Sequence, residues 1–319
     1  MEAREAELLP VQYFHVVFTL PAEIADIAYQ NKRVVYDLLF KVSAETMQII
    51  AADPMHLGAR VAITSVLHTW GSAMMHHPHV HMIVPGGGLS ADGEHWVDCR
   101  KGFFVPVRAL SKLFRRLMLG KLVAAHAAGR LSFHGRLAHL SEPRAFKRFL
   151  RSCRRRKWFV YAKRPFAGPK AVLAYLSRYT HRVAISNRRL IKADAEGVSF
   201  RVKDYRANPD KRWRTMTLAP HEFIRRLLMH VLPKGLHRIR HYGLFASGVK
   251  ADNLARMRQL LGATGSVVSN AEDSDGGEAP DDAIVRPCPS CGGVMRIIEV
   301  FEAGDTPRYH VTPEGIDSS

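Results

Sequence analysis

The sequence predicts an α+β fold in which helices pack on a central antiparallel sheet. Runs of β-branched and aromatic residues, which are typical of strands, occur among segments with apolar residues at helical spacing. Strands and helices do not alternate strictly, which argues against a parallel α/β sheet. Two of the strand-like runs, residues 61–70 and 79–87, are joined by eight residues, a length that suits an antiparallel hairpin.

The other elements follow in order along the chain. Residues 11–21 are typical of a strand that ends at Pro21, and residues 22–51 of one or two helices. Gly168 and Pro169 are start signals for a helix over residues 168–182. The remaining expected elements are helices over 109–129, 142–156 and 220–233, short strands within 183–205 around an acidic Gly turn, and a strand over 212–218.

The composition changes near residue 262 and divides the chain. Residues 263–285 are rich in Gly, Ser and Asp, which is typical of a flexible acidic linker. We therefore expect a catalytic domain over residues 1–262, this linker, and a short tail over 286–319. In the tail Cys288 and Cys291 form half of a zinc ribbon. Since a structural zinc needs four ligands, a weak zinc site and a pair of reduced thiols both remain open.

The net charge points to a nucleic-acid partner. The chain carries 47 Lys and Arg against 29 Asp and Glu, a formal charge of +18. Residues 144–164 contain ten basic residues and no acidic one, a cluster typical of contact with a phosphate backbone. The alternative is a merely basic soluble protein. The candidate DNA-binding residues are Arg148, Arg151, Arg154, Arg155, Arg156, Lys157, Arg178 and Arg182.

Three aromatic residues follow the basic run, and no segment is typical of a membrane protein. Trp158, Phe159 and Tyr161 could stack unpaired bases, but they also read as an ordinary strand, so we assign them to the core. No apolar run approaches the length of a bilayer span, and the N-terminus has no signal-peptide pattern. The four cysteines are too sparse for a disulfide framework, which suits a reducing cytoplasm.

The stretch HHPHVH, residues 76–81, predicts a metal site. On a strand His79 and His81 share one face while Val80 points into the core, so the two imidazoles form a pair of candidate metal ligands. The alternative is two polar residues on a solvated face. We favour His68, on the neighbouring strand, as the third ligand over His77, which we place in the connecting loop. The glycines after residue 85 would form a turn that clears space beside the site.

Two familiar zinc-hydrolase patterns are absent. An H-x-H-x-D-H site would need an aspartate where Ile83 stands, and the chain has no H-E-x-x-H. A second group of chemically useful residues lies on the helix expected over 168–182. Tyr175 and Tyr179 share one face of that helix. Such a pair is usually packing, but a phenol becomes a useful nucleophile when a metal polarises the phosphorus it attacks.

Together these motifs resemble one family. The chain is similar to HUH-type two-tyrosine rolling-circle transposases, the insertion-sequence ninety-one group. The resemblance covers residues 8–262 and rests on His79-Val80-His81, on residues 168–190 with Tyr175 and Tyr179, and on residues 221–243. It implies a sheet with the histidines on a central strand and the tyrosines on a facing helix. It also implies a bacterial protein in the cytoplasm, at the nucleoid.

The resemblance carries expectations about chemistry. It implies a divalent metal, Mg or Mn, on His79, His81 and a third ligand, although ligand softness alone would favour zinc. The implied substrate is single-stranded DNA at element ends, which a tyrosine would nick to leave a 5′-phosphotyrosine and a free 3′-hydroxyl. Two departures are Ser72, where the family has Gln, and the expected lack of an N-terminal zinc-binding domain. The alternatives are an inactive remnant that only binds DNA, and a rolling-circle replication initiator or relaxase.

Overall fold

The computed structural model describes residues 8–100, 102, 104–163, 184–204, 208, 212–262, 286–287 and 294–295. The chain divides into two compact units, Met1–Thr264 and Gly265–Ser319. The described part of the second unit is one short antiparallel pair, β11 (Arg286–Pro287) with β12 (Val294–Met295). The first unit holds every other described helix and strand.

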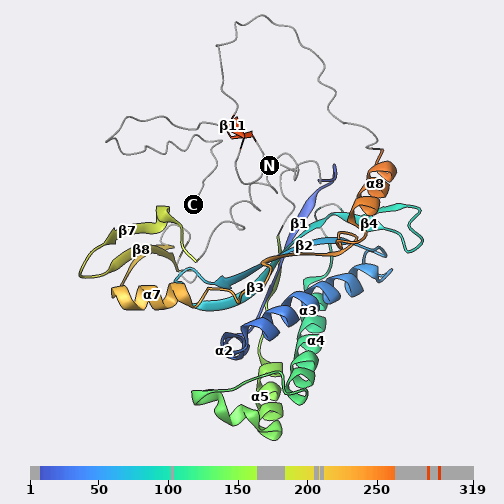
Figure 1. The fold of residues 1–319 in the computed structure, drawn as a ribbon. Coiled ribbons are helices and arrows are strands. Elements are labelled where there is room, and N and C mark those ends of the chain that lie inside the picture. Colours follow the sequence, from blue (N-terminus) through green and yellow to red (C-terminus); the bar gives the residue numbers. More distant parts are fainter. Residues whose placement is uncertain are drawn as a thin grey trace, which may run out of the picture. The chain divides into compact units, whose positions relative to one another are not determined.

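A five-stranded antiparallel sheet forms the centre of the first unit, in the order β10-β2-β3-β1-β6 (Figure 1). The strands are β1 (Tyr13–Thr19), β2 (Ala62–Trp70), β3 (His76–Pro85), β6 (Val160–Lys163) and β10 (Ile239–Gly243). The histidine-rich strand β3 is therefore the middle strand. The expected α+β fold with a central antiparallel sheet is confirmed.

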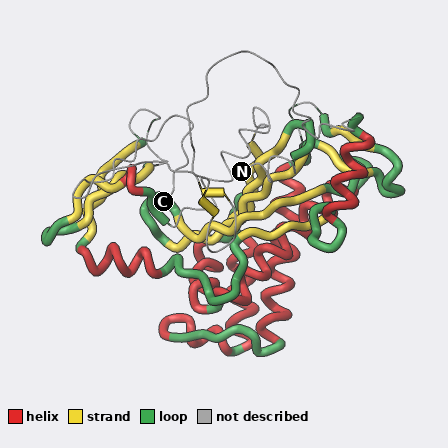
Figure 2. Tube along the Cα trace, turned by 45° about the horizontal axis from the view of Figure 1, so that its top comes forward, coloured by secondary structure: helices red, strands yellow, loops and turns green. Residues whose placement is uncertain are grey.

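One face of the sheet packs on helices. Alternate residues such as Val16, Leu67 and Met82 are fully buried in the main hydrophobic core, as strand periodicity requires. The helices whose apolar residues complete this core are α2 (Ala22–Gln30), α3 (Lys32–Ala52), α4 (Val107–Ala127) and α5 (Pro143–Arg155). Figure 2 shows these helices gathered on one side of the strands. A 3-10 turn, η1 (Gly135–Ser141), precedes α5.

Among the described residues, apolar side chains pack on the opposite face of the sheet at its two ends. At one end Ala62 and Ile83 pack with Leu254 and Met257 of α8 (Lys250–Leu260). At the other end Met74 packs against a second sheet. That sheet has the order β7-β8-β9, with the strands β7 (Leu190–Ala193), β8 (Val198–Lys203) and β9 (Trp213–Leu218). The short helix η2 (Asn187–Arg189) precedes it, and α7 (Pro220–Leu228) follows it. The histidines of β2 and β3 lie between these two covered ends.

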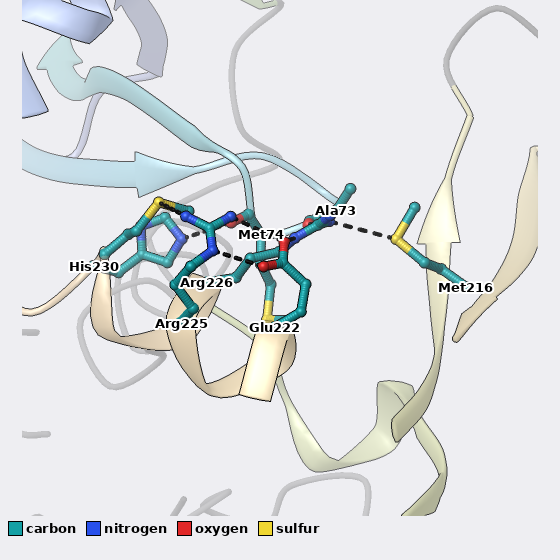
Figure 3. A network of polar contacts seen from close by, with 8 residues as sticks. Ala73, Met74, Met216, Glu222, Arg225, Arg226 and His230 are labelled. Atoms are coloured by element: carbon teal, nitrogen blue, oxygen red, sulfur yellow. Dashed lines mark hydrogen bonds and ion pairs between the residues drawn. The ribbon is translucent and has the colours of Figure 1, made fainter. Parts of the chain in front are cut away.

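The turn that joins β2 to β3, residues 71–75, is held by the second sheet and α7. The side chains of Arg189 and Arg226 donate to the carbonyl oxygens of Ser72 and Ala73, the latter at 3.0 Å. Figure 3 shows Arg226 between Ala73 and Glu222. The Ser72 hydroxyl accepts the backbone N–H of Lys203. Ser72 therefore anchors this turn.

Two expectations about the histidine strand are wrong. The strand β3 begins at His76, so His77 lies in the strand rather than in the connecting loop. The glycines that follow it do not clear space beside the histidines, because they allow close backbone approach at the far end of the strand. A Cβ on Gly88, within β4 (Gly87–Leu89), would lie 2.2 Å from the carbonyl oxygen of Arg60. The partner of β4 is β5 (Trp96–Asp98).

Candidate metal centre and nucleic-acid interface

Three histidines gather on the face of the sheet opposite to helices α2 to α5. His68 of β2 lies directly opposite His79 of β3, and His81 is two residues further along β3. One ligand atom of each residue lies within 4.8 Å of the others, an arrangement that could hold a metal ion. The ring centroids of His68 and His81 are 4.2 Å apart, and those of His79 and His81 are 4.8 Å apart. Strand pairing thus brings together the three residues proposed as ligands from the sequence.

Hydrogen bonds orient two of these rings. Nδ1 of His79 donates to the carbonyl oxygen of His77 at 2.6 Å, which leaves Nε2 as its ligand nitrogen. Nδ1 of His81 lies 2.8 Å from Nε2 of His15, which stands on the neighbouring strand β1. The rings of His15 and His81 are nearly parallel, with an interplanar angle of 12°. His81 therefore also presents Nε2 toward the cluster if Nδ1 carries the proton.

The surroundings keep His79 in the form that binds a metal. His68 and His81 are buried, and burial lowers the pKa of His79 to about 4. A histidine with such a pKa is neutral at neutral pH, and the neutral imidazole is the metal-binding form. The indole ring of Trp70 stacks on His68 with ring centroids 4.8 Å apart, which holds that imidazole in place.

The two remaining histidines of the stretch have other positions. His76 points to the helix side of the sheet, where its Nε2 lies 2.7 Å from the Tyr36 hydroxyl. His77 is exposed, and its ring centroid lies 5.3 Å from that of His79. His77 does not belong to the group of three that the described residues form. His15 was missed, although a histidine inside the apolar run YFHVVF was a signal that one strand face is polar.

The basic cluster forms an exposed face of α5. The helix begins at Pro143, and the Glu142 side chain caps it by accepting the backbone N–H of Ala145 at 2.8 Å. Its core face is small, with Phe146, Leu150 and Cys153 buried. The exposed members of the predicted DNA-binding set are Arg148, Arg151, Arg154, Arg155, Arg156 and Lys157. Arg156 alone of these has a described ion pair, with Glu23 at 3.0 Å.

The assignment of all three aromatics to the core is wrong for two of them. Trp158 is buried, and its indole N–H donates to the carbonyl oxygen of Cys153 at 3.0 Å. Phe159 and Tyr161 are instead exposed by 58% and 56%. The side chains alternate along this segment, so Phe159 and Tyr161 lie on the face of the sheet opposite to Trp158 and Val160, which are buried in the core with the helices.

The remaining predicted site residues lie outside the described residues. These are Tyr175, Tyr179, Arg178 and Arg182, together with Cys288 and Cys291 of the tail. Their roles stay predictions. Within the described part of the chain, every helix is too short or too polar to cross a membrane.

Comparison with known proteins identifies the family. A family model described as "Putative transposase" matches residues 62–253, which include the whole histidine hairpin. "Putative transposase y4qJ" of Sinorhizobium fredii is 52% identical over 95% of this chain and 77% of its own length. "Transposase for insertion sequence element IS801" of Pseudomonas savastanoi pv. phaseolicola is 27% identical over 77% of this chain and 57% of its own length. No solved structure matches. The chain belongs to this family, the transposases of the insertion-sequence ninety-one group.

Proposed function

We propose that this transposase nicks and joins single-stranded DNA at element ends through a 5′-phosphotyrosine intermediate. The observation that carries the proposal is the cluster of His68, His79 and His81 on the face of the central sheet opposite to the helices. A triad of closely spaced histidines, two of them buried and His79 kept neutral by burial, suits metal-dependent phosphate chemistry better than a structural role. The exposed arginines of α5 supply the backbone affinity that such a substrate requires.

The three imidazoles would hold one divalent ion. The donor set fits, because burial keeps His79 neutral, the three ligand atoms lie close together, and His77 and His15 orient the rings of His79 and His81. Imidazole ligands favour a late transition ion by softness, so the assignment of Mg or Mn comes from the family. When bound, the ion would polarise the scissile phosphate and stabilise the charge that develops on it.

Tyr175 and Tyr179 are the proposed nucleophiles. The phenolic oxygen forms a bond to phosphorus, and the bond from phosphorus to the 3′-oxygen breaks. The phenolic proton passes to solvent, and the leaving 3′-oxygen takes up a proton to become a hydroxyl. A phenol has a pKa of about 10 and is therefore protonated at neutral pH, so the reaction needs a site that favours the phenolate. The link conserves the phosphodiester energy, so joining needs no ATP.

The covalent adduct tests this proposal directly. A single-stranded oligonucleotide with the element end and a 3′ label is incubated with the full chain and manganese, then separated under denaturing conditions. We expect a labelled protein band that chelation of the metal removes. Tyr175→Phe combined with Tyr179→Phe should abolish the band, because phenylalanine keeps both rings and deletes only the nucleophiles.

A matched control separates this result from general damage. Tyr29→Phe removes the hydroxyl of a half-exposed tyrosine on α2 and should leave the band intact. If the band persists in the double variant of Tyr175 and Tyr179, neither residue is the nucleophile. If the unmodified protein gives no band but binds the oligonucleotide, the chain is a DNA-binding protein without nicking activity.

A further inference from the structure

Two aromatic rings next to the basic helix are exposed, Phe159 directly before the edge strand β6 and Tyr161 within it. Side chains alternate along this segment, so that Trp158 and Val160 are buried in the core while Phe159 and Tyr161 point away from it. More than half of each of these two rings is exposed, at 58% and 56%. Two exposed aromatic rings side by side on one strand face are a candidate interaction surface.

The same two rings lie on the face that carries the histidines. Tyr161 pairs with Val17, and Val17 pairs on its other side with His81. The backbone N–H of Thr19 donates to the carbonyl oxygen of Phe159 at 3.0 Å, and Thr19 pairs with His79. Each ring therefore continues a cross-strand row that contains a candidate metal ligand. Two strand spacings separate ring and histidine, about 10 Å.

Positively charged side chains lie close to the two rings. Nζ of Lys157 lies 5.0 Å from the ring centroid of Phe159, within the range of a cation–π contact. The segment from Pro143 to Lys157 contains eight basic residues and no acidic one. Aromatic faces beside a track of cations are the usual means of holding single-stranded nucleic acid, because bases stack on the rings while phosphates meet the charges. A protein partner would need a strongly acidic surface to fit here.

We propose that Phe159 and Tyr161 form a stacking platform for nucleobases of the single strand that enters the histidine cluster. The strand would run from the arginines of α5 across β6 toward His79 and His81. Two residues along a strand are about 7 Å apart, roughly twice the 3.4 Å rise of stacked nucleotides. The two rings would therefore hold two bases apart from each other. This inference rests on the proposed function, since it concerns the same substrate.

Binding measurements on the full chain test the platform. The probe is a fluorescent oligothymidylate, and its dissociation constant is measured by anisotropy at several salt concentrations. Phe159→Leu with Tyr161→Leu keeps apolar bulk on the strand but removes both aromatic faces. We expect binding about 5- to 100-fold weaker for each base that loses its stack. The salt dependence should stay unchanged, because the substitutions remove no charge.

A matched control and a second probe sharpen the result. Tyr29→Leu removes an exposed ring that also has a lysine over it, Lys32 at 5.4 Å, but lies on α2. It should leave the affinity unchanged. An oligonucleotide of abasic sites should bind the unmodified protein as weakly as the double variant binds the normal strand. The double variant should bind the abasic strand with the same affinity as it binds the normal strand. This second arm uses the unmodified protein, so it remains decisive even if the variant does not fold.

The outcomes distinguish this inference from the proposed function. If the protein binds no single-stranded DNA at all, the proposed function fails. If it binds with a steep salt dependence but equally well to normal and abasic strands, the platform is overturned and the proposed function stands. If the double substitution changes the sedimentation of the DNA-free protein and not its DNA affinity, the rings belong to a contact between copies of the chain, which also overturns the platform.

Discussion

Nε2 of His15 lies 2.8 Å from Nδ1 of His81, and the two rings lie on adjacent central strands. This contact places the proton of His81 on Nδ1 when His15 accepts, so that Nε2 can bind a metal. We predict that His15→Phe, which keeps a ring of similar size, lowers the affinity for Mn²⁺ about 10- to 100-fold. Calorimetric titration of the full chain with Mn²⁺ checks this.

A tautomer measurement separates positioning from general loss of structure. In the metal-free protein, nitrogen chemical shifts of His81 should report a proton on Nδ1, and His15→Phe should shift the population toward the Nε2-protonated form. His139→Phe, at an exposed histidine of η1, should change neither the tautomer nor the Mn²⁺ affinity. An unchanged Mn²⁺ affinity in His15→Phe would show that His15 does not position the ligand.

The histidine cluster should separate cleavage from binding. We predict that His79→Ala with His81→Ala reduces nicking by more than about 100-fold, because a bound metal contributes several kcal/mol to the transition state. His68→Ala should have an effect of the same direction. The affinity for single-stranded DNA should fall little, because phosphate contacts from the arginines dominate it. Nicking and anisotropy assays on the same preparations check both halves, and nicking at the unmodified rate would exclude a metal role.

The basic face of α5 should set the salt dependence of DNA binding. Arg154→Gln with Arg155→Gln should weaken binding to all sequences alike and reduce the salt slope by about 0.7 for each phosphate that the variant no longer neutralises. Arg156→Gln should add less, because Glu23 already lies 3.0 Å from that guanidinium. The control Lys41→Gln with Arg136→Gln removes two exposed charges from other helices. Equal slopes in the test and control variants would place the DNA elsewhere.

The fold was predictable where periodicity is strong. The runs around β1, β2 and β3 and the segments of α2 to α5 have clear strand or helix periods, and the structure has these elements close to the expected positions. The strand β10 was missed because IRHYG is short and polar. It is a strand because its backbone pairs with β2, and Arg240 meets Asp37 of α3 at 2.7 Å. Such tertiary contacts leave no periodic signal in a single sequence.

The residues of the candidate site were likewise predictable only where strand periodicity fixes them. His79 and His81 share a face because side chains alternate along a strand. Even spacing within the expected hairpin allowed His68 to face them from the neighbouring strand. The contact from His15 depends on the register between β1 and β3, which the sequence does not state. Phe159 and Tyr161 were assigned to the core because an edge strand and a covered strand have the same composition. The place of β6 at the edge of the sheet and the exposure of these two rings become visible only in the structure.

The network around Glu222 should make stability depend on pH. Glu222 accepts from Nε of Arg225 at 2.6 Å and from Nε of Arg226 at 2.7 Å (Figure 3). These hydrogen bonds lower the pKa of Glu222 to about 2. Arg226 in turn donates to Ala73, in the turn that joins the two histidine strands.

Because the folded-state pKa lies below the ordinary value of 4.5, this carboxylate stabilises the fold fully above that pH. The contribution is lost as the pH falls from 4.5 toward about 2. We predict that Glu222→Gln unfolds at a lower urea concentration than the unmodified protein at pH 7, and that the difference shrinks below the ordinary pKa of the carboxyl. The control Glu94→Gln removes an exposed carboxylate that pairs with Arg256 at 3.1 Å. If the two proteins differ in urea midpoint as much below pH 4.5 as at pH 7, Glu222 stabilises the fold through its shape and not through its charge, because protonation at low pH removes only the charge.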